Sequence, residues 1–242
     1  MKKNLSAFII CTIMFVTFTV TSAQEGPGDG WGFVIIPHLW YTAIGGDVHI
    51  NDQENQLGEF VEAHDFALLA YVEARYGKFG LFFRPSSVRI SRKDENGTGI
   101  GSSNFKAWIF ELAGTYRFLG DGSSKTTSAD LFIGARRWDE AVDWTDPMLG
   151  LRVRFALSKK LLLHARGDLG GFNIAGNTSD LSWNLTADLA YRIAPAISLW
   201  AGYHILHTKF DEDSTGGEFS LEGTIHGPGI GAGFHFGSMP RK

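Results

Sequence analysis

Residues 146–169 contain two runs in which apolar side chains occupy every second position, on either side of a short polar turn. The apolar positions are Leu149, Leu151, Val153, Phe155 and Leu157 in the first run and Leu161, Leu163, Ala165 and Leu169 in the second. The positions between them include Arg152, Arg154, His164, Arg166 and Asp168. A period of two belongs to a β-strand, because successive side chains point to opposite faces. The segment therefore predicts a long β-hairpin with one apolar face and one charged face.

The same alternation recurs along the chain and predicts an all-β protein of ten strands, with eight as the alternative count. The expected strands are 31–42, 66–76, 79–91, 105–118, 129–138, 149–157, 161–169, 181–193, 197–210 and 222–236. Their lengths are close to or above what a tilted strand needs to cross a bilayer. No segment of helical period competes with them.

The connections alternate in length. Short turns follow the second, sixth and eighth strands, whereas long polar loops, 45–65, 92–103 and 211–218, follow the first, third and ninth. Membrane barrels place short turns in the periplasm and long loops outside the cell. An even strand number then leaves both termini in the periplasm.

A soluble lipocalin-like barrel with an apolar interior is the alternative to a membrane barrel, and three features favour the membrane. Glycines are frequent on the charged face, as an enclosed lumen requires, and strand edges lack protection by Pro or Lys, which favours closure. Aromatic residues on the apolar face gather near strand ends, as interfacial girdles do. This predicted girdle comprises Trp31, Phe33, Tyr41, Phe66, Tyr76, Phe79, Trp108, Tyr116, Phe118, Phe155, Trp183, Tyr191, Phe234 and Phe236. We expect a closed antiparallel up-and-down transmembrane β-barrel.

The N-terminus predicts export. Lys2 and Lys3, an apolar run and the small residues ending at Ala23 form a Sec-type signal peptide, 1–23, followed by one barrel domain, 24–242. A retained anchor is disfavoured because the run is shorter than the roughly 20 residues that a spanning helix needs. Cys11 lies in the signal, so the exported chain has no thiol. Loss of the two lysines takes the net charge from -4 to -6, which argues against a nucleic-acid partner.

The polar face predicts a lumenal charge network. Its members are Glu73, Arg75, Arg84, Glu111, Arg117, Asp130, Arg136, Asp146, Arg152, Arg154, Arg166, Asp168, Asp188 and Arg192. Charges in so narrow a barrel must pair, since an unpaired buried ion is costly. The expected pairs are Asp130 with Arg117 and Arg154, Glu73 with Arg84, and Asp188 with Arg166. Such a network is either a structural plug that stiffens the barrel or a polar constriction that filters small solutes.

Other candidate chemistry is weaker. Residues 227–233 alternate glycine with other residues but lack the Lys-Ser/Thr of a phosphate loop, so a strand with a small inward face is favoured. The acids of loops 45–65 and 211–218 could bind a divalent cation, but solvated loop charge is the favoured interpretation. His204 and His207 face opposite sides of one strand, so no catalytic pair is predicted. We expect no metal site, no cofactor and no catalytic residues.

Four segments carry a resemblance: residues 144–152, 166–172, 226–228 and 233–236. In these the chain resembles a largely uncharacterised family of Gram-negative outer-membrane β-barrel proteins, in the OmpA-like and OmpW-like group. The resemblance implies the fold and the outer-membrane location, with outer-membrane lipid and lipopolysaccharide as surroundings. It also implies folding by the outer-membrane assembly machinery, which reads a C-terminal aromatic residue, here Phe236. It carries no established reaction.

The sequence therefore favours a structural barrel or a narrow passive pore. An outer-membrane enzyme, either an omptin-like protease or a lipid A-modifying enzyme, is the alternative from another class. A surface-binding barrel that acts through its extracellular loops is the third hypothesis.

Overall fold

The computed structural model describes residues 30–50, 53–57, 65–91, 104–120, 127–139, 143–174, 177–214 and 217–237. The strands in these ranges are β1 (Trp31–Ile50), β2 (Gln53–Leu57), β3 (Asp65–Tyr76), β4 (Phe79–Ser91), β5 (Asn104–Leu119), β6 (Ser128–Asp139), β7 (Trp144–Ala156), β8 (Leu161–Gly171), β9 (Leu181–Ala194), β10 (Ile197–Ser214) and β11 (Gly217–Gly237). Among the same residues, the structure contains no helix of the length and apolarity that crossing a membrane requires.

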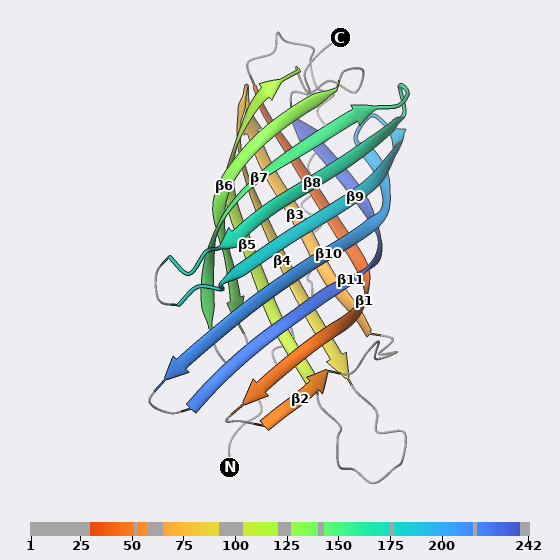
Figure 1. The fold of residues 1–242 in the computed structure, drawn as a ribbon. Helices are drawn as coiled ribbons and strands as arrows, with labels where there is room; N and C mark the ends of the chain where they lie inside the picture. Colours follow the sequence, from red (N-terminus) through yellow and green to blue (C-terminus); the bar gives the residue numbers. More distant parts are fainter. Residues whose placement is uncertain are drawn as a thin grey trace, which may run out of the picture.

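All strands except β2 form a closed barrel (Figure 1). Each strand pairs antiparallel with its neighbour in sequence, and β11 closes the barrel by pairing with β1, for example at Leu39 and Ile230. The predicted ten-stranded, closed, up-and-down barrel is thus confirmed. Closure leaves the barrel without an unpaired edge, which is the condition for placing strands in lipid.

Tight turns join the strands at one end, which we call the short-turn end. Gly77, between β3 and β4, has a φ of +56°, a conformation that other residues rarely adopt. Between β7 and β8 the Ser158 hydroxyl accepts the N–H groups of Lys160 at 3.2 Å and Leu161 at 3.1 Å. The predicted turns at these positions are present.

The two faces of the barrel have opposite polarity. Ile133 on β6 points outward and is 69% exposed, whereas Arg136 on the same strand points inward and is 0% exposed. Leucine, isoleucine and aromatic side chains cover the outside along the other strands in the same way. An apolar exterior around a charged interior is stable in hydrocarbon and not in water. The barrel therefore spans a membrane.

The structure corrects two predicted loops. Within the predicted loop 45–65, β1 continues to Ile50 and β2 pairs with it, from Gly46 opposite Leu57 to Ile50 opposite Gln53. Within the predicted loop 211–218, β10 runs to Ser214 and β11 begins at Gly217. Backbone pairing joins these extensions to their neighbours, and their residues lack the apolar alternation from which sequence periodicity assigns a strand. The predicted signal peptide lies outside the described residues.

The extensions continue one side of the barrel sheet beyond the ends of the neighbouring strands. Pairing of β10 with β9 stops at Lys209 opposite Leu181, and pairing of β1 with β3 stops at Thr42 opposite Asp65. Beyond these points β10, β11, β1 and β2 continue as a four-stranded sheet at the end of the barrel opposite the short turns.

Candidate functional site: the barrel interior

Two carboxylates gather the arginines nearest the short-turn end. Asp130 Oδ1 accepts Arg117 Nε at 2.9 Å, and Oδ2 accepts Arg152 Nη2 at 2.7 Å and Arg75 Nη2 at 3.0 Å. The Glu73 carboxylate accepts both Arg152 and Arg75, at 2.9 and 2.8 Å. We call these groups, together with Arg154, the short-turn layer. Arg152 lies across the lumen from Glu73 and ties β7 to β3.

Glu111 organises a second set of charges, the central layer. It accepts Arg136 Nε at 2.9 Å and Arg166 Nη1 at 2.8 Å, and lies 3.6 Å from Arg84 Nη1. Asp168 pairs with the same two arginines, with Arg136 at 2.5 Å and Arg166 at 2.7 Å. All five side chains are buried, so the layer is a network of ion pairs, three of which are also charge-assisted hydrogen bonds.

His204 extends the central layer towards Asp188. Arg84 Nη2 lies 3.1 Å from His204 Nδ1, and His204 Nε2 lies 2.9 Å from Asp188 Oδ1. A guanidinium has only donors, so Nδ1 accepts from Arg84 and the proton sits on Nε2, which donates to Asp188. The chain of contacts satisfies both ring nitrogens inside the barrel. This buried imidazole is a structural link between β4, β9 and β10.

An aromatic group separates the two charged layers. Tyr71 stacks on Phe82 with ring centroids 5.6 Å apart, and Phe82 meets Phe132 edge-on at 5.4 Å. The Arg166 guanidinium lies 5.1 Å from the Phe82 ring centre and 4.9 Å from that of Phe132. The Tyr71 hydroxyl donates to Glu73 at 2.7 Å and also contacts Arg152. The rings therefore fill space between the two sets of charges, which come nearest where Arg152 lies opposite Arg166 in the register of β7 with β8.

A larger apolar cluster fills the interior towards the other end of the barrel. Trp138 stacks on Trp144 at 5.2 Å, and Trp144 stacks on Phe210 at 4.4 Å. The complete cluster is Trp40, Ala67, Leu69, Val88, Ile109, Trp138, Trp144, Leu206, Phe210, Leu221 and Ile225. These residues come from every barrel strand except β8 and β9. We call this cluster the apolar plug.

The apolar plug has no member from β8 or β9. On that side of the interior, the connection between these two strands packs against the start of β7. The backbone N–H of Ser179 donates to Asp146 Oδ1 at 2.7 Å, and both residues are completely buried. Asn177 Nδ2 donates to the Asp143 carbonyl at 2.8 Å. Asp146 thus holds the connection against the start of β7.

Glycines make room for the large inward side chains. A Cβ at Gly150 would lie 2.3 Å from the Phe132 ring, and one at Gly231 would lie 2.6 Å from the His38 ring. Each glycine therefore marks a point where a neighbouring side chain crosses in front of its strand. Within 227–233, Gly231 and Gly233 have this packing role.

The structure confirms some predicted ion pairs and corrects others. Asp130 pairs with Arg117 at 2.9 Å and with Arg154 at 3.7 Å, as expected. The predicted pair of Glu73 with Arg84 is wrong, because Arg84 lies directly opposite Glu111 in the register of β4 with β5.

The predicted pair of Asp188 with Arg166 is also wrong. Asp188 fills the space in front of Gly202 and meets His204, while Arg166 reaches across the lumen to Glu111. The last member of the predicted network, Arg192, is half-buried near the short-turn end of β9.

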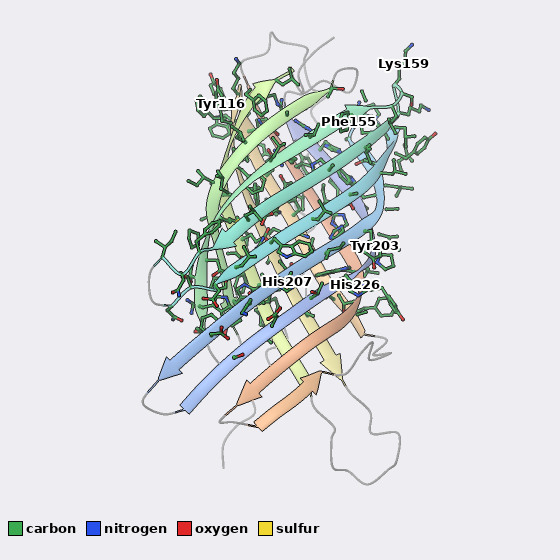
Figure 2. All side chains as sticks on the ribbon, in the orientation of Figure 1. Tyr116, Phe155, Lys159, Tyr203, His207 and His226 are labelled. Atoms are coloured by element: carbon green, nitrogen blue, oxygen red, sulfur yellow. The ribbon has the colours of Figure 1, made fainter. Side chains whose placement is uncertain are left out.

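The residues of the predicted girdle lie on the outer face, and all except Tyr41 and Trp183 are exposed. Neighbouring members touch, for example Phe79 with Tyr116 at 5.3 Å and Tyr41 with Phe66 at 5.7 Å. Figure 2 shows Tyr116, Phe155 and Lys159 at the short-turn end, with Tyr116 on the left and the other two on the right. Their position suits the boundary between hydrocarbon and headgroups.

Sequence analysis missed an outward pair and the apolar plug. The Tyr203 hydroxyl and His226 Nδ1 are 2.7 Å apart on the outer face, and β10 and β11 continue beyond them in Figure 2. Trp40, Trp138 and Trp144 stand on the same face of their strands as the lumenal charges. That shared face is the signal that identifies them as interior residues.

Comparisons were made with known proteins. No family model matches the chain, and no curated protein matches it. Similar solved structures include the outer membrane protein AlkL in DMPC lipid bilayers, with 12% identity, 91% of this chain and 97% of that chain covered, and a TM-score of 0.42. The outer membrane protein OprG from Pseudomonas aeruginosa has 11% identity, 89% and 100% coverage, and a TM-score of 0.38. The translocator domain of the autotransporter NalP from Neisseria meningitidis has 14% identity, 84% and 88% coverage, and a TM-score of 0.42.

This chain is similar to outer-membrane β-barrel proteins. Outer-membrane β-barrel proteins are also the class that the sequence resemblance implies. At these identities the likeness extends to the fold alone.

Proposed function

We propose that the chain is a structural β-barrel of the Gram-negative outer membrane with a closed, charge-paired lumen. It is exported through its signal peptide, 1–23, and residues 24–242 form one barrel domain with both termini in the periplasm. Outer-membrane lipid and lipopolysaccharide surround the girdle residues, and the outer-membrane assembly machinery inserts the barrel. The predicted lumenal charges hold the wall together from inside.

The apolar plug is the observation that carries this proposal. Trp40, Trp138, Trp144 and Phe210 are almost completely buried, and the rings of the last three form one continuous stack. A hydrophobic constriction excludes water and with it hydrated ions. The side chains of the charged layers below it form ion pairs with one another. The interior therefore acts as a packed core and not as an aqueous channel.

Planar-bilayer recording tests the closed lumen. The purified barrel should give no stepwise conductance, whereas a double Trp138→Ala, Trp144→Ala variant that still folds should show openings, because it lacks two rings of the stack. An exposed-ring variant, Phe79→Ala, is the matched control and should stay silent. Stepwise openings of the unmodified barrel would refute the closed lumen and favour the narrow passive pore.

A surface-binding role is the second candidate, and the four-stranded extension of β10, β11, β1 and β2 favours it. This sheet continues beyond the points where β9 and β3 have ended. A deletion that shortens the β10–β11 hairpin to Asp211 and Ser220 removes part of it and keeps Phe210 and Leu221 of the apolar plug. Loss of adhesion of whole bacteria with an intact barrel would support this candidate.

The proposal treats the chain as non-enzymatic. Incubation of the purified barrel with lipid A or with unfolded peptide substrates, followed by mass spectrometry, tests that statement. A change in lipid A mass or the appearance of peptide fragments would instead support an outer-membrane enzyme.

A further inference from the structure

The two carboxylates of the short-turn layer are shared by other arginines before Arg154 is counted. Both oxygens of Glu73 accept Arg152, and one of them also accepts Arg75. Asp130 Oδ2 already accepts Arg152 and Arg75, and its other oxygen accepts a further arginine. Leaving Arg117 out of the count, the guanidinium groups of Arg75, Arg152 and Arg154 share two carboxylates. The layer therefore carries an excess of positive charge.

Arg154 holds this excess. Its Nη2 lies 3.7 Å from Asp130 Oδ2, which is too long for a hydrogen bond. Among the residues that the structure describes, neither Nε nor Nη2 of Arg154 has a hydrogen-bond partner. A guanidinium that is partly removed from water and lacks hydrogen bonds is costly. A counter-charge from outside the layer would remove this cost.

The central layer does not supply that counter-charge. There Arg84, Arg136 and Arg166 are matched by Glu111, Asp168 and Asp188, so the charges already balance. Phe82 and Phe132 also stand between the two layers. The excess is thus local to the short-turn end.

The unbalanced arginine is accessible from that end. The side chain of Arg154 is 27% exposed and that of Arg75 is 13% exposed, whereas the other arginines of the layer are almost completely buried. Arg75 also donates to the carbonyl of Lys78 in the β3–β4 turn, at 3.4 Å. Lys159 and Lys160 in the β7–β8 turn add positive charge at the same end, where Figure 2 shows Lys159.

We propose that Arg154 and Arg75 form an anion-binding site at the short-turn mouth of the lumen, which takes an oxyanion such as phosphate. A guanidinium offers a planar fork of donors that matches two oxygens of a phosphate group. The site is independent of the closed lumen, because it lies on the short-turn side of the charged layers and the apolar plug lies towards the other end.

Calorimetric titration of the full chain in uncharged detergent tests the site, with sodium phosphate as the probe and sodium chloride at equal ionic strength as the reference. We expect saturable phosphate binding that Arg154→Gln weakens about tenfold or more, since a charge-assisted hydrogen bond is lost. Arg154→Lys keeps the charge and should bind with intermediate affinity. Arg137→Gln is the matched control, because Arg137 is an exposed arginine near the other end, paired with Asp143 at 2.7 Å. It should bind as the unmodified chain does.

Nanodiscs distinguish a free ion from a lipid headgroup. Saturable binding of phosphate in detergent identifies the free oxyanion. A thermal stabilisation seen in phosphatidylglycerol nanodiscs but not in phosphatidylcholine nanodiscs, and lost in Arg154→Gln, identifies an anionic headgroup at the same site. The proposal is overturned if the chain shows neither phosphate binding nor stabilisation by phosphatidylglycerol. It is also overturned if Arg154→Gln and Arg137→Gln weaken binding equally. Either result means that the chain's own carboxylates balance the layer. Heat-modifiable electrophoretic mobility confirms that each variant is folded.

Discussion

Replacing Glu111 by glutamine tests whether the central layer stabilises the barrel. The carboxylate accepts hydrogen bonds from Arg136 at 2.9 Å and Arg166 at 2.8 Å, and lies 3.6 Å from Arg84. Glutamine keeps the shape of the side chain and one acceptor oxygen. It loses one charge-assisted hydrogen bond, worth about 1.5–3 kcal/mol, and leaves buried guanidinium charge uncompensated. We expect the free energy of unfolding to fall by about 3 kcal/mol.

Urea unfolding of the barrel in lipid vesicles, followed by tryptophan fluorescence and by electrophoretic mobility, measures this change. The matched control is Arg137→Gln, which breaks an exposed ion pair with Asp143 and should cost less than about 1 kcal/mol. If Glu111→Gln also costs less than about 1 kcal/mol, the central layer does not hold the wall together, and this account of its energetics is wrong.

Two further predictions concern the faces of the wall. Gly231→Ala should destabilise the barrel by about 1–3 kcal/mol, because the new Cβ would lie 2.6 Å from the His38 ring and 2.7 Å from the Pro37 carbonyl oxygen. Gly223→Ala on the same face of β11 should be nearly neutral, since its nearest neighbour would be 3.7 Å away; equal unfolding midpoints for the two would contradict the packing argument. Ile133→Arg places a charge on the lipid-facing side and should cost about 2–4 kcal/mol in vesicles, while Ile133→Val should cost little. If Ile133→Arg leaves the free energy of unfolding in vesicles unchanged, this face does not lie in the hydrocarbon.

The interior alternates charged and aromatic levels along the barrel axis. Ion pairs link the groups within each charged level, and the aromatic rings pack next to them. Polar contacts are stronger in such surroundings, and unpaired groups are more costly. Within the short-turn layer, Nε and Nη2 of Arg154 lack a hydrogen bond despite the ion pair with Asp130.

The sequence alone was sufficient for the barrel wall. Alternation in segments such as 181–193 assigns each residue to the outer or inner face, because the side-chain period of a strand is a local property of the backbone. Turn residues such as Gly77 and Ser158 mark the short-turn end for the same reason. The outward position of the girdle residues follows from these local signals, whereas the choice of ten strands over eight and the closure of β11 on β1 came from the structure.

Only the tertiary structure decided which inward groups meet. Glu73 on β3 binds Arg152 on β7, and Arg166 on β8 binds Glu111 on β5, across the lumen and not between neighbouring strands. Those partners depend on the tilt of the strands and the width of the barrel, which no single segment encodes. The apolar plug depends on them as well, since Trp144 becomes part of a core only where Trp138 and Phe210 arrive at the same level.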